Sequence, residues 1–445
     1  MRILIYSINF SPELTGIGKY SGEMAEWLAG RGHQVRVVAA PPHYPQWRVF
    51  QGHSAWRYSR ERIVAKDSFG KFDVFRCPVW VPRVPRSWKR VVHLLSFSLG
   101  SLPVMLRQIS WRPDVVLLVA PTLICSPQAL YVARLSGGVA WLHVQDFEVD
   151  AAFELKDFSS VLLRRAVQFL ERGLIRRFAR VSAISERMVE RLSDKGIDTA
   201  RSTLFPNWVN TSIIYPLPGP SPLRKELGIA NDTVVALYSG SMGKKQGLDM
   251  LMLASHRLAS RPDIQFVFCG DGPDREAFAR TATKAGRVML LPLQSVERLN
   301  DLLNLADVHL LPQLADAADL MMPSKLTGMM ASGRAIVATA HAGTQVATVL
   351  EGRGMVTPPG DVDAFVTAVA RLADDGQLRR AMGEDARKYA VDHMDQDEIL
   401  SRFERSMLIA SGHAAGTEQE LGARPRGQSP AVESFAIVPG KAGDD

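Results

Sequence analysis

The sequence predicts an α/β protein made of two Rossmann-like, doubly wound domains, and three observations lead to this prediction. Short, nearly continuous apolar runs alternate with helical patterns from the first residues onward, as in a parallel sheet covered by helices on both faces. Residues 206–222 then interrupt the alternation with five prolines and one glycine, which regular structure does not accommodate. Beyond this segment the alternation starts again, so the chain of 445 residues is expected to hold two domains.

In the first half, apolar runs predict the strands and helical spacing predicts the helices. Met24, Trp27 and Leu28 recur at helical spacing within residues 18–30. Ser185 follows an apolar run and can cap the next helix, because a serine hydroxyl accepts hydrogen bonds from the free amides of a helix start. Strands are expected at residues 2–8, 34–40, 115–120, 139–144 and 181–184.

The second half repeats this order. Strands are expected at residues 233–239, 264–269, 288–291, 308–311 and 335–338, and helices at 247–259, 297–306, 326–331, 359–373 and from 377 to about 410. The break at the proline-rich segment predicts an N-terminal domain at residues 1–205 and a C-terminal domain at residues 206–389. Residues 411–445 are rich in Gly, Ala, Pro and charge and are expected to be disordered.

The composition, with 46% hydrophobic and 22% charged residues, is that of a soluble globular protein. The three cysteines, Cys77, Cys125 and Cys269, lie far apart, which argues against a disulfide framework or a zinc site and fits a reducing compartment. The first ten residues are typical of a buried strand and not of a signal peptide, because they lack a long apolar segment and a small-residue cleavage site. A cytoplasmic protein is therefore expected.

Positive charge is concentrated in residues 1–205, although the net charge of the chain is +7. A basic first half indicates an anionic partner, and the absence of a nucleic-acid motif favours a phospholipid surface or a pyrophosphate-linked acceptor over nucleic acid. Residues 79–113 and 161–180 mix Arg, Lys and Trp with large apolar residues, as surface helices at a membrane do. The alternative is a pair of packed helices with their arginines in water.

Gly16 and Gly18 follow the first predicted strand after a gap. A dinucleotide fingerprint would place its first glycine directly after the strand and an acid at the end of the second strand, so NAD binding is disfavoured. Two interpretations are left open: a glycine loop close to a substrate phosphate, or a simple turn before a helix.

A second glycine-rich loop, at residues 239–247, contains Gly240 and Lys245. Its glycines allow backbone amides to approach an anion and its lysines supply charge, whereas the spacing is not that of a P-loop. The alternative is a solvated lysine pair. Gly270 and Asp271 end a later strand and can pass close to a nucleoside, although taken alone this segment is better explained as an ordinary turn.

A third phosphate candidate is the Pro-Ser-Lys segment that contains Ser324 and Lys325. A Pro-Ser pair before an apolar helical run predicts a helix start, where the serine hydroxyl can satisfy free amides, and such an end attracts anions. Two carboxylates, Asp316 and Asp319, precede it and can accept hydrogen bonds from sugar hydroxyls or stabilise a cationic sugar ring. The alternative is a pair of solvated loop acids.

Polar residues also follow the strand predicted at residues 139–144. Gln145 and Asp146 stand where open α/β sheets place their chemistry, and we expect both to line a cleft. A metal site is conceivable because more acids follow, but their spacing matches no strong ligand pattern.

Together these segments resemble the family 4 glycosyltransferases of GT-B architecture, and within that family the WcaI-type branch of colanic acid biosynthesis. The matching segments keep their order over roughly residues 1–340 and are SPELTGIGKYSGEMAEWL (11–28), APPHYPQW (40–47), SAWRY (54–58), RCPVWVP (76–82), HVQDFEVDA (143–151), FPNW (205–208), LYSGSMGKKQGL (237–248) and ADAADLMMPSKLTGMMASG (315–333).

This resemblance implies two Rossmann-like domains facing across a cleft that holds the active site. The C-terminal domain would hold a nucleotide-diphosphate sugar as donor substrate, with no other cofactor and no metal, and the resemblance suggests a GDP-sugar. The N-terminal domain would hold the acceptor, and the helix at about residues 390–410 would pack back on it. The resemblance also implies that the sugar keeps its anomeric configuration.

Two departures from the family pattern bear on the site. The family often carries a Glu pair where this chain has Leu320 and Gly328, and a His where it has Gln145. The residues expected to act are therefore Lys245, which would neutralise the leaving diphosphate, and Asp319, Gln145 and Asp146, which would meet the sugar or acceptor.

The expected function is transfer of a sugar to a polyprenyl-pyrophosphate-linked oligosaccharide at the inner face of the cytoplasmic membrane, in bacterial exopolysaccharide assembly. The alternatives are a non-catalytic partner in such an assembly and a nucleotide-sugar epimerase.

Overall fold

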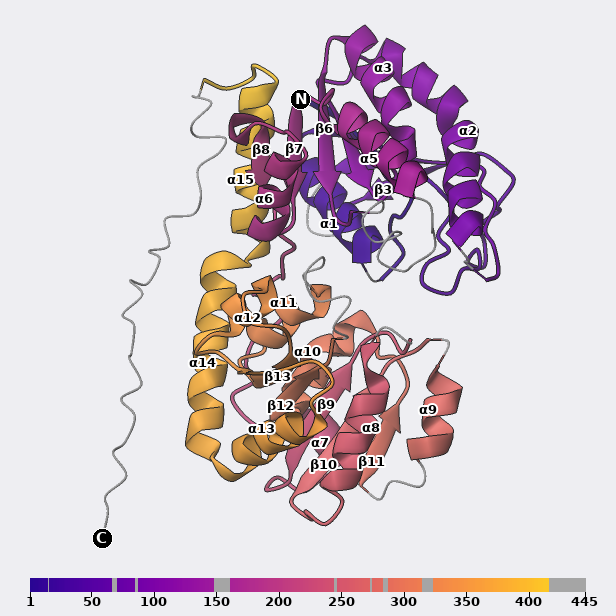
Figure 1. Ribbon diagram of the computed structural model, residues 1–445. Coiled ribbons are helices and arrows are strands. Elements are labelled where there is room, and N and C mark those ends of the chain that lie inside the picture. Colours follow the sequence, from indigo (N-terminus) through magenta and orange to yellow (C-terminus); the bar gives the residue numbers. More distant parts are fainter. Residues whose placement is uncertain are drawn as a thin grey trace.

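The structure is a computed structural model that describes residues 1–14, 16–65, 70–84, 87–147, 161–243, 246–272, 274–282, 287–313 and 323–415. The chain folds into two α/β lobes, and the first lobe lies above the second in Figure 1. Asp316, Asp319, Leu320 and Lys245, which the sequence analysis singled out, lie outside the described residues, as does the tail from residue 416 onward.

The first lobe is built on a sheet of eight strands in the order β3-β4-β2-β1-β5-β6-β7-β8. β3 pairs with β4 in antiparallel fashion, and every other pair is parallel. The strands are β1 (Arg2–Tyr6), β2 (Gln34–Ala39), β3 (Ser59–Val64), β4 (Lys71–Arg76), β5 (Val115–Ala120), β6 (Val139–Val144), β7 (Arg180–Ala183) and β8 (Ser202–Leu204).

Helices cover both faces of this sheet, because its central strands are apolar on both sides. Along β1, Leu4 and Tyr6 enter one core and Ile3 and Ile5 enter the other. The first core includes residues of α2 (Ser87–Trp111), α3 (Ser126–Ser136), α5 (Val161–Ile175) and α6 (Glu186–Asp194). The second core includes residues of α1 (Gly16–Gly30) and α15 (Gln396–Ala410).

The second lobe is built on six parallel strands in the order β11-β10-β9-β12-β13-β14. They are β9 (Val234–Ser239), β10 (Ile264–Cys269), β11 (Val288–Leu291), β12 (Val308–Leu311), β13 (Ala335–Thr339) and β14 (Met355–Thr357). One face packs against α8 (Leu248–Arg257), α9 (Arg275–Ala282) and α13 (Val362–Asp374). The other packs against α7 (Pro222–Glu226), α10 (Leu299–Leu305), α11 (Ser324–Ala331), α12 (Gln345–Leu350) and α14 (Gly376–His393).

The chain returns to the first lobe after α14, so that α15 lies beside β7 and β8 in Figure 1. Phe403 of α15 stacks on Phe205, with ring centroids 3.7 Å apart and planes within 6° of parallel. It also meets Trp141 of β6 edge-on at 5.1 Å. The C-terminal helix is therefore part of the core of the first lobe.

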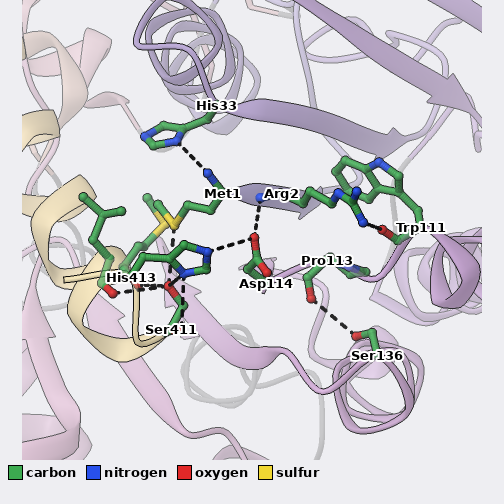
Figure 2. A network of polar contacts seen from close by, with 11 residues as sticks. Met1, Arg2, His33, Trp111, Pro113, Asp114, Ser136, Ser411 and His413 are labelled. Atoms are coloured by element: carbon green, nitrogen blue, oxygen red, sulfur yellow. Dashed lines mark hydrogen bonds and ion pairs between the residues drawn. The ribbon is translucent and has the colours of Figure 1, made fainter.

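Figure 2 shows the contacts that join the end of α15 to the start of β1. Asp114 accepts a hydrogen bond from the amide of Arg2 at 2.6 Å and lies 3.6 Å from Nε2 of His413. Ser411 donates to the sulfur of Met1 at 3.6 Å. The two ends of the described chain are thus fastened to one another.

The predicted strands at residues 115–120, 139–144, 264–269, 288–291 and 308–311 match the structure residue for residue. Ser185 is confirmed as a helix cap, because its side chain accepts from the amide of Met188 at 3.2 Å. The sequence analysis missed β3, β4, β8 and β14. β3 carries alternating charges because it is an edge strand, and its Arg60 and Arg62 pair with Asp73 of β4.

Candidate active site

The two lobes meet where α1 and α11 begin. The hydroxyl of Tyr20 in α1 donates to the carbonyl of Ser324, the first residue of α11, at 3.4 Å. Trp208, in the linking segment, meets the Tyr20 ring edge-on at 5.1 Å, and its carbonyl accepts from Oγ1 of Thr327 at 3.5 Å. Its indole N–H donates to Glu23 of α1 at 2.8 Å. One tryptophan therefore holds the starts of both helices side by side.

Lys325 places an ammonium group at this boundary, half-buried. Its Nζ lies 4.4 Å above the Tyr238 ring and donates to Oε1 of Gln246 at 3.3 Å. Burial lowers the pKa of Lys325 to about 7, and no charge of a described residue offsets this effect. An anion bound beside Nζ would favour the charged form and raise the pKa again.

The loop after β9 approaches Lys325 through Gly240. The φ of Gly240 is 142°, which favours glycine, and a Cβ there would lie 3.4 Å from Cδ of Lys325 and 3.8 Å from its Nζ. The hydroxyl of Tyr238 donates to the carbonyl of Ser241 at 2.6 Å and so fixes the turn. The fold thus brings Gly240, Ser324 and Lys325 together from two distant segments.

The start of α11 differs in one respect from the expectation. The helix begins at Ser324, two residues earlier than predicted, with Pro323 at the N-cap and no side-chain cap. The prediction that the Ser324 hydroxyl satisfies the helix amides is wrong, because Ser324 is the first helical residue instead of the capping one. The amide of Leu326 donates to the carbonyl of Pro323 at 3.0 Å. The first amides of the helix, those of Ser324 and Lys325, have no partner within the helix and can donate to an anion.

Gly270 has a packing role that the sequence analysis did not foresee. A Cβ at this position would lie 1.9 Å from the carbonyl oxygen of Gly240. The amide of Gly240 donates to the carbonyl of Cys269 at 3.0 Å, and the amide of Met242 donates to the carbonyl of Asp271 at 2.8 Å. The exposed Asp271 carboxylate accepts from the following amide at 2.8 Å. The loops after β9 and β10 are therefore locked together.

On the first lobe, Glu13 packs against the loop that contains Gly16 and Gly18. Glu13 is buried, and the sequence analysis did not identify it. A Cβ at Gly18 would lie 2.6 Å from Cβ of Glu13, whereas Gly16 has a φ of 58° and open space around it. The Glu13 carboxylate accepts from the amides of His43 and Tyr44 at 2.9 and 3.0 Å. Burial raises its pKa, and these hydrogen bonds oppose that effect.

Gln145 and Asp146 follow β6, as predicted. The side-chain amide of Gln145 lies 3.0 Å from Nε2 of His143, and Nδ1 of His143 lies 3.0 Å from Oγ of Ser182. Burial lowers the pKa of His143 to about 3, so the ring is neutral. Nε2 then accepts from Gln145 and Nδ1–H donates to Ser182, which holds Gln145 in place.

The charge of Asp146 affects the pKa of Tyr44, which lies in the loop after β2. Burial raises the pKa of Tyr44, the charges of Glu13 and Asp146 raise it further, and Arg90 lowers it. The carboxyl ends of β1, β2 and β6 therefore contribute to one surface of the first lobe. Among the described residues no group of three or more His, Cys, Asp or Glu side chains is placed to hold a metal ion.

Solved structures share this arrangement over nearly the whole chain. Sucrose-phosphate synthase from Thermosynechococcus elongatus superposes with a TM-score of 0.72 at 15% identity, covering 93% of this chain and 100% of that one. Anabaena HepE in complex with UDP gives 0.67 at 17% identity, covering 92% and 99%. WaaG, a glycosyltransferase of lipopolysaccharide biosynthesis, gives 0.63 at 17% identity, covering 92% and 100%. The fold is the GT-B architecture of glycosyltransferases, as predicted.

Sequence comparison defines the family. Residues 15–208 match the glycosyl transferase 4-like domain, and residues 221–389 match the glycosyl transferases group 1 domain. The Escherichia coli (strain K12) protein assigned as the colanic acid biosynthesis glycosyl transferase WcaI is 38% identical over 414 residues, which cover 91% of this chain and 98% of that protein. The chain belongs to the family 4-like GT-B glycosyltransferases, and it is a glycosyltransferase. The predicted family and enzyme class are confirmed.

Proposed function

We propose that the enzyme transfers a sugar from a nucleotide-diphosphate donor to a lipid-linked oligosaccharide during assembly of a bacterial exopolysaccharide. The observation that carries the donor part is the meeting of Lys325, the Gly240 loop and the start of α11 at the boundary between the lobes. The similarity to WcaI of E. coli, a protein named for colanic acid biosynthesis, supports the assembly of a polysaccharide. A GDP-sugar is the donor that we propose, with no further cofactor and no metal.

The chemistry requires charge stabilisation on the leaving group. As the glycosidic bond breaks, negative charge grows on the diphosphate oxygen, and fixed donors aimed at that oxygen lower the barrier. Lys325 and the first amides of α11 supply such donors. We propose that Lys245 also neutralises the leaving diphosphate, that Asp319 meets the sugar, and that Asp271 lies near the nucleoside. Gly16 and Gly18 allow the first lobe to approach the phosphates, and Gln145 and Asp146 meet the sugar or acceptor. We propose retention of the anomeric configuration.

A thermal-shift screen of GDP- and UDP-sugars, followed by transfer of the labelled sugar into bacterial lipid extract, tests this function. One donor at 100 times its Kd is expected to stabilise the protein by about 2.7 kcal/mol, a shift of about 3 °C or more for a chain of 445 residues. The label is expected to enter the lipid fraction. Absence of binding by every donor would favour a non-catalytic partner, and isomerisation of the donor without acceptor would favour an epimerase.

We also propose that the first lobe rests on an anionic membrane surface. Large apolar side chains form an exposed stripe along α2 at helical spacing, here termed the α2 stripe: Trp88, Val91, Leu95, Leu99, Leu102 and Leu106. Trp88 is 61% exposed and Leu99 is 69% exposed. Tyr58, which is also exposed, donates to the carbonyl of Gly100 in α2 at 2.9 Å, and Trp56 is exposed two residues before it.

The charges around the α2 stripe support a membrane as its partner. Lys89 and Arg107 lie on the same helix, and Arg57 lies between Trp56 and Tyr58. An apolar helix face bordered by cations is the pattern of interfacial membrane helices. Within the described part of the chain, no helix combines the length and apolarity that crossing a bilayer requires.

Sedimentation with phosphatidylglycerol vesicles measures this contact. Wild-type protein is expected to bind the vesicles at low salt. In 0.5 M salt its affinity for them is expected to fall on the order of tenfold, because surface charges are then screened. Leu99→Glu is expected to weaken binding about tenfold or more by placing a charge in the apolar interface. The matched control is Leu253→Glu, on an exposed leucine of the second lobe. Equal binding by both variants, or none by wild type, would contradict the membrane proposal.

A further inference from the structure

The loop after β2 holds two aromatic side chains in a fixed arrangement on the first lobe. Trp47 adopts a φ of 52°, a left-handed conformation that is unfavourable for a bulky residue and is often found at functional sites. Its ring packs edge-on against His43 at 6.0 Å and His93 at 5.3 Å. Both histidines are buried, and the Nδ1 of each contacts a backbone carbonyl, that of Pro41 or Trp80. The two buried histidines therefore hold the Trp47 ring in place.

Arg90 brings a charge to this loop. Its guanidinium lies 5.8 Å from the centre of the Trp47 ring, and the residue is exposed. Arg90 follows Trp88 by two residues, about 200° around the helix, so it lies on the opposite side of α2 from the stripe and faces the loop. The described residues include no carboxylate within ion-pair distance of it. A guanidinium that lies over an aromatic ring and has no counter-ion among the described residues suits a phosphate.

Tyr44 connects this charge to Asp146. The positive charge of Arg90 and the negative charges of Glu13 and Asp146 all affect the pKa of the Tyr44 hydroxyl. Tyr44 therefore lies close enough to Arg90 and to Asp146 to interact electrostatically with both. Tyr44 is 39% exposed, and its amide is fixed by Glu13 at 3.0 Å. A ligand that spans this surface would meet a cation at one end and a carboxylate at the other. A phosphate-linked sugar has that polarity, because its hydroxyls donate to a carboxylate and its phosphates accept from an arginine.

We propose that Arg90, Tyr44 and Trp47 form an anion subsite that binds the diphosphate of an isoprenoid-diphosphate-linked acceptor, with the sugar directed toward Asp146. This inference rests on the proposed lipid-linked acceptor and assigns residues to its diphosphate. The isoprenoid would leave the subsite past the first turn of α2, next to Trp88, where the α2 stripe begins. The subsite and the stripe are then successive parts of one acceptor path.

Calorimetric titration of the full-length protein with farnesyl diphosphate, a short isoprenoid diphosphate, tests the subsite without sugar transfer. Arg90→Gln is expected to weaken binding about 10- to 100-fold, since one hydrogen-bonded charge is lost. Trp47→Phe is expected to weaken it less and to retain the ring. The matched control Arg134→Gln, an exposed arginine of α3, is expected to bind as wild type. Farnesol, which lacks phosphate, is expected not to compete.

Three results would overturn the proposal. The first is equal affinity of Arg90→Gln and Arg134→Gln for farnesyl diphosphate. The second is competition by farnesol as strong as that by the diphosphate. The third is displacement of farnesyl diphosphate by short-chain phosphatidylglycerol at equal concentration, which would identify a lipid headgroup as the ligand. Donor stabilisation of Arg90→Gln, measured by thermal shift, reports whether that variant is folded. Loss of sugar transfer with normal farnesyl diphosphate binding would instead count against the proposed function alone.

Discussion

Replacing Lys325 by alanine is expected to lower kcat/KM for sugar transfer by about 100- to 1,000-fold, the effect of losing one donor to a developing oxyanion. The ammonium is the charge that the described part of the second lobe places at the lobe boundary, next to Gly240 and the start of α11. Initial-rate kinetics with the donor found by the thermal-shift screen measure the loss. The fold is expected to survive, since the contacts of Nζ with described residues are limited to the Tyr238 ring and Gln246.

The pH dependence of donor binding also tests the role of Lys325, because the direction of the change can be predicted. Burial lowers the pKa of Lys325 to about 7 in the free enzyme, whereas a bound diphosphate favours the ammonium and raises that pKa. Binding therefore takes up a proton above pH 7, and the donor Kd is expected to rise up to about tenfold per pH unit until the pKa of the complex is reached. Lys325→Arg, which stays charged, is expected to lose this dependence.

Lys225→Ala is the control, because Lys225 is exposed on α7 of the same lobe. It is expected to match wild type in kcat/KM and in the pH dependence of the donor Kd. A Lys325→Ala enzyme with wild-type kcat/KM would show that the leaving diphosphate is held elsewhere.

Gly270→Ala is expected to have the second large effect, on both stability and donor binding. The new Cβ would lie 1.9 Å from the Gly240 carbonyl oxygen, a backbone atom that cannot move without separating the loops after β9 and β10. Overpacking of this kind costs about 1–3 kcal/mol of unfolding free energy. Because Gly240 lies against Lys325, the same displacement is expected to weaken donor binding more than tenfold, measured by calorimetry.

The matched substitution is Gly219→Ala, at a glycine where a Cβ meets no atom within 4 Å. It is expected to leave both the midpoint of thermal unfolding and the donor Kd within error of wild type. If Gly270→Ala bound donor as tightly as Gly219→Ala, the two loops would not shape the donor site.

The fold was predictable where burial alone decides the local structure. Apolar runs such as residues 115–120 and 264–269 have no other stable position than the middle of a parallel sheet, and their bounds match. The edge strand β3 was not predictable, because its charged residues find their partners only in the fold: Arg60 and Arg62 pair with Asp73, and Glu61 pairs with Arg76. Ser185 was identifiable as a cap, whereas Ser324 was misassigned because a preceding proline can itself take the N-cap position.

The candidate site was predictable only in part, because its residues are distant along the chain. Glycine and lysine patterns indicated Gly240 and Lys325, but only the fold shows that one passes against the other. Glu13 was not recognised, since nothing in a single acid reveals that it accepts from the amides of His43 and Tyr44. Arg90 and Trp47 are unremarkable in sequence and become a pair only when α2 packs over the loop.

A crystal structure of the enzyme with a nucleotide sugar that stabilises it tests the central claim most directly. The account predicts that diphosphate oxygens lie within about 3.2 Å of the Lys325 ammonium and of the first amides of α11, with the sugar facing Gly16 and Gly18 of the first lobe. A diphosphate bound to other residues, with Lys325 left in contact with Tyr238 and Gln246 alone, would contradict it.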